Sequence, residues 1–100
     1  MSDASDARTA VVVTTDHQDV FFGYVPADTE LTERTLRLED CRMCVWWPTE
    51  QHGAVGLAAD GPSDGSRITA AAPAMTLHGV TSVMECSDRA VERWEDEPWN

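Results

Sequence analysis

The sequence predicts a mainly β protein, folded as a small, partly closed β-barrel or as a β-sandwich of six to seven short strands, with one C-terminal α-helix. Short segments rich in β-branched and aromatic residues recur at close spacing, with turn residues between them. The hydrophobic pattern changes to a helical period only in the last segment, from residue 87 on. A chain of 100 residues has the length of one domain and can bury its own core.

The first two strands are expected at residues 10–15 and 20–25, which are rich in valine and aromatic residues. The polar segment 16–19 between them predicts a turn, so the pair reads as a hairpin. Gly23 inside the second strand indicates a bulge or a sharp bend, and Pro26 ends that strand.

Further short segments carry strand character. Residues 35–38 alternate polar and apolar side chains, as a half-buried strand does, and residues 41–47 are apolar enough for a central strand. We interpret residues 54–59 as another strand. The segment 60–66 combines glycine, proline, serine and aspartate, and it is the strongest loop signal in the chain.

The remaining β segments are residues 67–69, a short strand, and residues 75–85, in which Gly79 indicates a bulge. Residues 70–73 leave the choice between strand and loop open. Closure into a barrel would remove the unpaired strand edges that a small open sheet exposes. Oligomerisation through an edge strand would have the same effect.

The C-terminal segment predicts a helix at about residues 87–97. Ser87 is a favourable N-cap, and Asp88 suits the first turn of a helix. Pro98 ends the segment. The apolar stripe of this helix consists of Ala90, Val91 and Trp94. We expect a flexible tail at residues 1–9 and a single β-rich domain at residues 10–99.

Acidic residues dominate the charge of the chain. Eighteen aspartates and glutamates stand against seven arginines, there is no lysine, and the net charge is −11. This balance disfavours binding to a nucleic-acid backbone, which needs clustered cations. Because the acidic residues are spread along the chain, we interpret them as a solvated surface. The alternative is an acidic face that recognises a basic partner or mimics DNA.

The start of the chain shows neither the basic nor the apolar region of a signal peptide, and no apolar run approaches the length that spans a bilayer. We therefore expect a soluble protein that is not secreted and has no membrane partner.

Three cysteines, an odd number, argue against a disulfide framework. Cys41 and Cys44 are spaced like half of a zinc site, but the chain offers no second close pair. On a strand, residues three apart point to opposite faces, so these two thiols would not converge on one metal ion. We expect both of them in the core. We predict no metal site.

No combination of side chains indicates catalysis. The serines of the expected loops do not lie in a nucleophile-elbow pattern, and each histidine stands alone. We predict a protein that is not an enzyme, with no catalytic residues and no cofactor. One sharper hypothesis concerns the glycine-bearing stretch 53–65, where Gly61 and its neighbours would let backbone amides approach a phosphate that Arg67 could bind. Ordinary turn chemistry is the alternative.

The aromatic side chains give the main functional signal. Four tryptophans among seven aromatic residues are more than one small core readily buries. Adjacent Trp46 and Trp47 on a strand must face opposite sides, so one of them should be exposed or in an interface. Exposed tryptophan is typical of binding surfaces. The candidate binding residues are Trp46, Trp47, Trp99, Tyr24, Arg67 and Gly61.

Several stretches, in a fixed order, carry a family resemblance. They are residues 11–15, 20–24, 44–47, 56–62 and 77–81, followed by Ala90, Trp94, Pro98 and Trp99. Together they cover about residues 10–99 and resemble a family of short proteins of unknown function that is common in tailed phages and prophages. The order of the strands also resembles that of small SH3-like or Sm-like barrels, which is an analogy of fold only.

The resemblance implies a viral or prophage setting, in the host cytoplasm or in the virion. Our leading hypothesis is a non-enzymatic accessory protein that acts by binding, as a homo-oligomer, to a protein or a small ligand. The first alternative is a structural or decoration protein of the virion. The second is a counter-defence factor, either an acidic mimic or a nucleotide-binding sponge.

Overall fold

The computed structural model describes residues 8–16, 19–32, 34–47, 53–63 and 65–96, and these form six strands and two helices. The strands are β1 (Arg8–Thr15), β2 (Val20–Pro26), β3 (Thr35–Trp46), β4 (Arg67–Ile68), β5 (Ala72–His78) and β6 (Val80–Glu85). The helices are α1 (Gly53–Ala59) and α2 (Asp88–Asp96). The expected mainly β fold with a C-terminal helix is confirmed.

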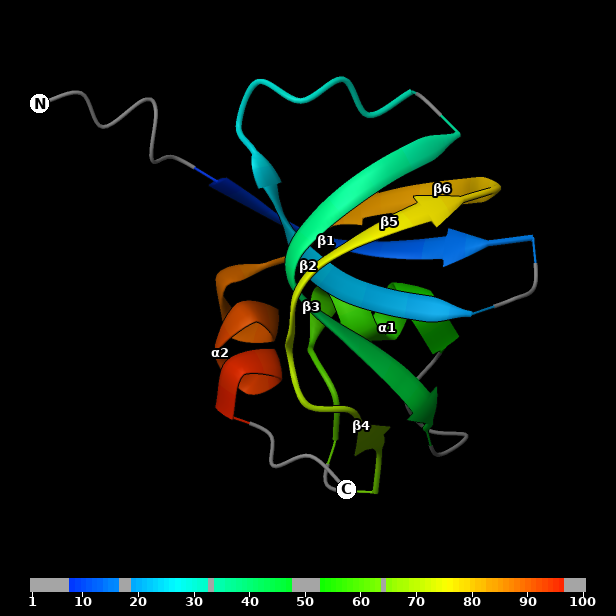
Figure 1. The fold of residues 1–100 in the computed structure, drawn as a ribbon. Coiled ribbons are helices and arrows are strands. Elements are labelled where there is room, and N and C mark those ends of the chain that lie inside the picture. Colours follow the sequence, from blue (N-terminus) through cyan, green and yellow to red (C-terminus); the bar gives the residue numbers. More distant parts are fainter. Residues whose placement is uncertain (1–7, 17–18, 33, 48–52, 64, 97–100) are drawn as a thin grey trace, which may run out of the picture.

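All six strands belong to one antiparallel sheet with the order β4-β3-β2-β1-β6, and β5 pairs with the first part of β3 (Figure 1). The predicted hairpin of β1 and β2 is confirmed, with Val12 opposite Phe22. The long strand β3 therefore has two neighbours on one side, because β4 takes over from β5 at its end.

The sheet does not close into a barrel, which corrects that part of the predicted fold. Strands β5 and β6 follow each other directly, but β5 pairs with β3 and β6 with β1. Gly79 lies between them with a φ of +71°, a conformation that favours glycine. This bend sends the two strands to different partners, so the expected single strand at residues 75–85 is two strands.

A second correction concerns residues 54–59, which form helix α1 and not a strand. The apolar residues Ala54, Leu57 and Ala58 follow the i, i+3, i+4 spacing of a helix. A run this short fits either structure, and its alanines favour the helix. Within the helix, Leu57 and Ala58 are buried.

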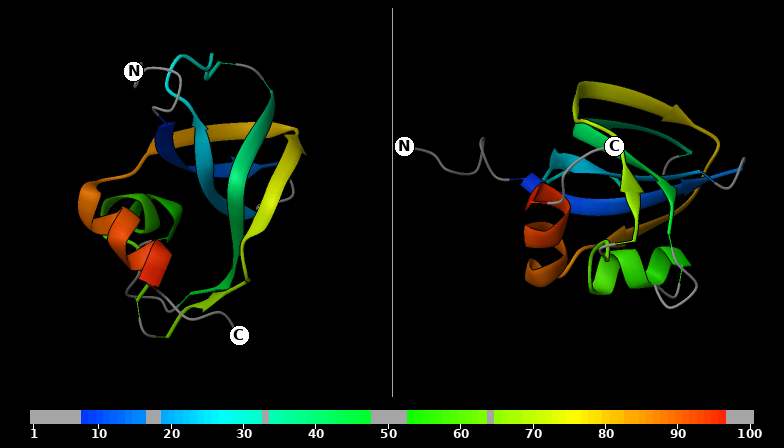
Figure 2. Two further views of the ribbon diagram at one scale, coloured as in Figure 1. Left: turned by 60° about the vertical axis from the view of Figure 1, so that its left-hand side comes forward. Right: turned by 90° about the horizontal axis from the view of Figure 1, so that it is seen from below.

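Two hydrophobic cores lie on the two faces of the sheet. The inner core contains Val11, Val13, Phe21, Val25, Leu36, Leu38, Cys41, Leu77 and Val80. The helix-side core contains Val12, Val20, Phe22, Cys44, Leu57, Ala58, Ile68, Ala90 and Trp94. Figure 2 shows both helices side by side on one side of the curved sheet. Because both faces are covered, β1 is apolar throughout its buried stretch and does not alternate.

A bulge at Asp40 changes which side chains of β3 face inward. Three residues of β2, from Phe22 to Tyr24, stand opposite four of β3, from Glu39 to Arg42, and Asp40 has a φ of +50°. The predicted irregularity at Gly23 is confirmed at this point of the ladder, with the extra residue on β3. A Cβ at Gly23 would lie 2.7 Å from the Cβ of Leu38, so only glycine fits there.

Helix α2 begins as predicted. The amide of Ala90 donates to Oγ of Ser87 over 3.0 Å, which confirms the N-cap. Trp94 is completely buried and stacks on Phe22, with the ring centroids 4.8 Å apart. Its indole N–H donates to the carbonyl of Leu57 over 3.0 Å, so the side chain joins both helices to the sheet.

Candidate binding site

Among the candidate binding residues from the sequence, Trp46 and Arg67 are the pair that the fold brings together. They occupy opposed positions in the ladder between β3 and β4. Together with Val45 and Gly65 they line a hollow of about 440 Å³. Trp99 lies outside the described residues.

A bulge at Val45 explains why Trp46 points to solvent. Cys44 pairs with Ile68 and Trp46 with Arg67, so β3 carries one extra residue at this point. Cys44 belongs to the helix-side core. Without the bulge, Trp46 would follow Cys44 to the same face; with it, the indole is 52% exposed and Val45 is 58% exposed.

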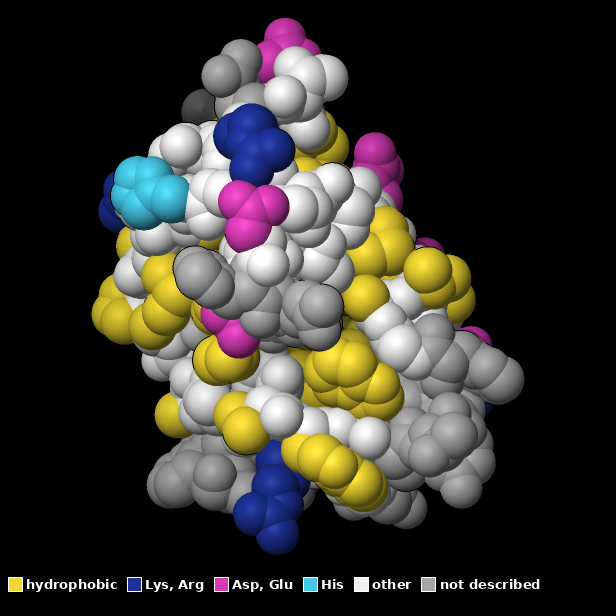
Figure 3. All heavy atoms as spheres, turned by 90° about the vertical axis from the view of Figure 1, so that its right-hand side faces the viewer, with side chains coloured by type: hydrophobic (Ala, Val, Ile, Leu, Met, Phe, Trp, Pro, Cys, Tyr) yellow, Lys and Arg dark blue, Asp and Glu magenta, His cyan; other side chains and the backbone are white. Residues whose placement is uncertain are grey.

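Trp47 packs partly buried against the helix-side core. The expectation that the adjacent tryptophans face opposite sides, one covered and one open, is therefore confirmed. Figure 3 shows the side of the molecule where β1 and β3 end and β2 begins. Hydrophobic side chains gather over the lower half of this view, above a basic side chain at its lower edge, while acidic side chains lie mostly higher.

Arg67 is exposed and makes no ion pair with any described residue. None of the four described residues that line its hollow is acidic. Its neighbour in the chain, Ser66, is buried, and the amide of Ser66 donates to the carbonyl of Ser63 over 2.9 Å. The exposed guanidinium thus follows a buried residue and lies beside an open indole.

Tyr24 lies elsewhere, in a structural position. Its hydroxyl donates to Glu95 of α2, and the guanidinium of Arg8 lies 4.2 Å from its ring centroid. Burial and then the hydrogen bond to Glu95 raise the pKa of Tyr24. Arg8 also pairs with Asp40 over 3.0 Å and with Glu39 over 3.3 Å, so the group fastens the β3 bulge and α2 to β2.

The glycine-bearing stretch does not gather around one ligand position. Gly53 and Gly56 lie in helix α1. Gly61, with a φ of +81°, lies against α2, where a Cβ would come within 2.7 Å of the Cβ of Arg93. Of this stretch, Gly65 lines the hollow beside Arg67.

The thiols lie where the sequence places them. Cys41 is buried in the inner core and Cys44 in the helix-side core, on opposite faces of β3, and neither forms a disulfide. Burial raises the pKa of Cys41 to about 11 and that of Cys86 to about 12. Within the described ranges, no three His, Cys, Asp or Glu side chains cluster as metal ligands would. His17 and His52 lie outside these ranges.

A family assignment follows from comparison with known proteins. The model of a domain of unknown function, DUF6948, matches residues 8–94. The chain belongs to this family. No curated protein and no solved structure matches this chain. Neither helix in the described part of this DUF6948 chain has the length and apolar character that a membrane crossing requires.

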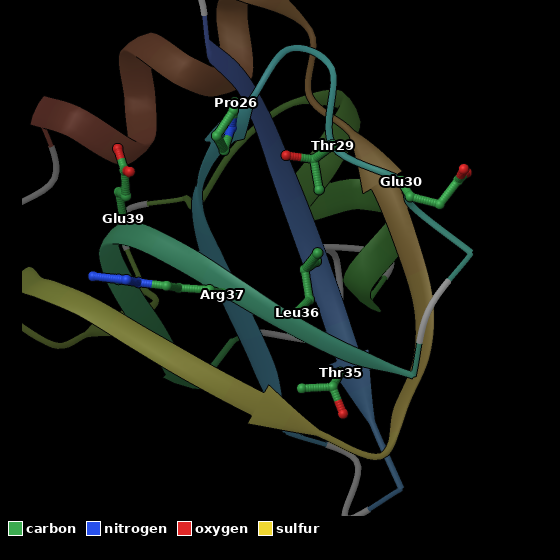
Figure 4. A pocket seen from close by; sticks show the side chains of 7 residues that line it. All are labelled: Pro26, Thr29, Glu30, Thr35, Leu36, Arg37 and Glu39. Atoms are coloured by element: carbon green, nitrogen blue, oxygen red, sulfur yellow. The ribbon is translucent and has the colours of Figure 1, made fainter.

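Sequence reasoning missed two further hollows of the DUF6948 fold. One, of about 490 Å³, lies between the loop after β2 and the start of β3 (Figure 4). Its lining residues are Pro26, Thr29, Glu30, Thr35, Leu36, Arg37 and Glu39. In Figure 4, Leu36 points from β3 toward Thr29 of the loop. No sequence motif indicates this hollow, because the loop and the strand each have the residue pattern of an ordinary surface segment.

The other hollow, of about 440 Å³, lies between α1 and β6. Val55, which is 67% exposed, lines it together with Met84 and Cys86. It could not be predicted because residues 54–59 were interpreted as a strand.

Proposed function

We propose that this chain is a non-enzymatic binding protein and that it makes contact through the hollow lined by Val45, Trp46, Gly65 and Arg67. The observation that carries the proposal is the half-exposed indole of Trp46, held on a strand by a bulge that turns it away from the core. Tryptophan and arginine are the side chains that contribute most to binding hot spots. Single exposed apolar side chains are common on protein surfaces, but Val45 and Trp46 are adjacent, and it is contiguous exposed apolar surface that marks interaction sites.

The two hollows described above support this proposal less well. The described lining of the hollow of Figure 4 has two glutamates and two threonines but no aromatic side chain. The hollow between α1 and β6 is lined mostly by small or flexible side chains, and none of its described residues carries an aromatic ring. Only an aromatic face next to a cation offers both contact area and directional recognition.

Self-association is part of the proposal, as the sequence predicts a homo-oligomer. Val45 and Trp46 alone are far smaller than the roughly 800 Å² that each partner of a standard interface buries, so a stable oligomer would need additional surface. Each copy carries a charge of −11, and salt screens repulsion between copies. Light scattering should therefore show a mass above 11.0 kDa that rises with salt. A monomer under all conditions would end this part of the proposal.

We further propose a phage or prophage setting, on the strength of the stretches that carry the family resemblance. In that setting the accessory role is separable from its alternatives. Mass spectrometry of purified virions detects a structural or decoration protein and finds none of this chain if its role is accessory or in counter-defence.

The proposed contact surface can be tested by mapping weak binders onto it. We would record two-dimensional ¹H–¹⁵N spectra of the full chain with a fragment mixture of neutral aromatic, aliphatic, cationic and anionic members. We expect the fragments to cause chemical-shift changes concentrated at Val45, Trp46, Gly65 and Arg67. These changes should be lost in Trp46→Ser. Val55→Ser is the matched control, because Val55 is exposed on another hollow. Shifts that ignore the Trp46 hollow, or that survive Trp46→Ser, would contradict it.

A further inference from the structure

We infer that the Trp46 hollow binds a small planar anion, an aromatic ring that carries a phosphate or carboxylate group, with the ring on Trp46 and the anionic group on Arg67. This inference rests on the proposed function and specifies its ligand. Three features of the hollow support it: the position of the two side chains, the lack of carboxylates among its described lining residues, and its size.

The first feature is the pairing of the two side chains. Trp46 and Arg67 stand opposite each other in an antiparallel ladder. Directly opposed residues have their Cβ atoms about 5 Å apart and project to the same face of the sheet. No ion pair or ring contact with described residues occupies either side chain. An indole face and a guanidinium are thus presented together, a few ångströms apart.

The second feature is the charge at the hollow. In a chain with eighteen acidic residues, two other arginines form ion pairs: Arg8 pairs with Glu39 and Asp40, and Arg34 with Asp16. Arg37 shares its hollow with Glu30 and Glu39. Among the described residues, no acidic side chain lines the hollow of Arg67. A guanidinium that forms no ion pair with a described carboxylate can bind a phosphate or carboxylate through two parallel hydrogen bonds.

The third feature is size. A hollow of about 440 Å³ lies in the usual range for small-ligand sites, about 300–1,000 Å³. Gly65 adds no side chain to its rim, so a ligand can approach the backbone there. The four described lining residues offer one indole for stacking and one guanidinium for an anion. A ligand with a single ring and a single anionic group would contact both.

The net charge of the protein limits how many charges the ligand carries. The hollow offers one described cation, whereas the whole chain carries −11. Each additional phosphate would meet this repulsion without a further arginine to bind it. We therefore expect a ligand with one phosphate or carboxylate to bind at least as tightly as its triphosphate counterpart.

The test is a titration of the full chain, followed by the indole N–H signal of Trp46 and the amide signals of Gly65 and Arg67. The probes are adenosine 5′-monophosphate, adenosine, adenosine 5′-triphosphate, benzoate and inorganic phosphate. Adenosine 5′-monophosphate and benzoate each combine a ring with an anion, a phosphate in the first and a carboxylate in the second, and at least one of them should shift the signals of the hollow. The triphosphate should bind no more tightly than the monophosphate, and inorganic phosphate alone should bind more weakly.

The variants separate the two contacts. Arg67→Gln should weaken the better ring-plus-anion probe about tenfold, the loss expected for one charge-assisted contact, and leave adenosine unchanged. Trp46→Ser should weaken that probe and adenosine alike, whereas Trp46→Phe should retain part of the binding because it keeps a ring. Arg37→Gln is the matched control, since Arg37 is exposed and lies in the other hollow, and it should change nothing.

Two results would overturn the inference. One is that neither ring-plus-anion probe shifts the signals of the hollow, and the other is that Arg67→Gln leaves their affinities unchanged. The proposed function fails separately: if neutral fragments still bind at Trp46 while both anionic probes do not, the contact surface stands and only its assigned ligand is wrong.

Discussion

Trp94 and Trp46 present the same side chain in two opposite settings. Trp94, on α2, is completely buried, stacks on Phe22 and donates its indole N–H to the carbonyl of Leu57. Trp46, at the end of β3, is half exposed beside Arg67, with no such partner in the described part of the chain. Trp94 holds the two helices on the sheet, whereas Trp46 is accessible to a ligand or a partner.

A strand irregularity, and not hydrophobicity, decides which of these two tryptophans can bind. The regular part of the sheet directs alternate side chains into covered cores, whereas the bulge at Val45 redirects Trp46 to solvent. Substitutions near Trp94 should therefore lower stability, and substitutions at Trp46 should lower binding.

The largest effect is expected from Trp94→Ala. Removing a fully buried aromatic side chain leaves a cavity, and such changes reduce the free energy of unfolding by about 3–5 kcal/mol. Chemical denaturation followed by circular dichroism measures the loss. Trp94→Phe, which keeps the ring over Phe22 but lacks the N–H, should lose clearly less. Equal stability of Trp94→Ala and the parent chain would break the comparison.

Arg42→Met should have the next largest effect. This arginine is buried on β3; its Nε donates to the carbonyl of Thr69 over 2.8 Å, and its guanidinium also donates to the carbonyl of Trp94. Methionine fills similar space but leaves buried carbonyls without donors, so we expect a loss of about 2–4 kcal/mol in the free energy of unfolding. Arg37→Met, at an exposed position of the same strand, is the control. A loss as small as that of the control would mean that Arg42 does not fasten α2.

Stability should fall as the pH rises from about 9 to about 11. Burial in the inner core raises the pKa of Cys41 to about 11, above its value in the unfolded chain, so the folded state favours the protonated thiol. The stabilisation is complete below the unfolded pKa and is lost as the pH approaches the folded one. Urea denaturation at pH 8, 9, 10 and 11 measures the slope. Cys41→Ala should reduce the slope without abolishing it, because the raised pKa values of Cys86 and Tyr24 act in the same direction. An unchanged slope would show that the thiol of Cys41 is not responsible.

Ser87→Ala should cost about 1 kcal/mol, the usual contribution of a helix N-cap. Oγ of Ser87 accepts from the amide of Ala90 over 3.0 Å and donates to the carbonyl of Ala59 over 2.6 Å, so it also joins α2 to the end of α1. Ser87→Asp keeps an acceptor at the cap but cannot donate to Ala59 when ionised, and it should recover part of the loss. Identical stability of Ser87→Ala and the parent chain would contradict this account of the helix start.

The smallest effect on stability is expected from Trp46→Ser. Exposed positions outside the core usually change the free energy of unfolding by no more than about 0.5 kcal/mol. The same denaturation experiment, run beside Trp94→Ala, gives the sharpest form of the comparison. A loss of several kcal/mol for Trp46→Ser would show that this indole supports the fold, and its role as a contact residue would have to be abandoned.

The sequence was informative where local signals and tertiary packing agree. The hairpin of β1 and β2, the capped helix α2 and the buried cysteines follow from period, turn residues and spacing. Helix α1 was missed because its short apolar run fits both a strand and a helix. Closure of the sheet was overestimated because the bend at Gly79 reads locally as a bulge within one strand.

For the site, adjacency alone predicted that one of Trp46 and Trp47 would be open. Their partner could not be predicted, because the ladder that places Arg67 opposite Trp46 joins segments far apart in the sequence. The bulge at Val45 could not be predicted either, because no glycine in this part of β3 indicates it. Arg42 was missed as well, since arginine is usually exposed, and its burial depends on carbonyls that only the tertiary fold brings near.

Acrylamide quenching of tryptophan fluorescence shows whether the indole of Trp46 is accessible to solvent, as its proposed role as a contact residue requires. The parent chain and Trp46→Phe would be compared under identical conditions, so that the other tryptophans contribute equally to both. We predict that the readily quenched part of the emission falls sharply in Trp46→Phe. Quenching curves that coincide would show that Trp46 is already covered, and the proposed contact surface would not exist.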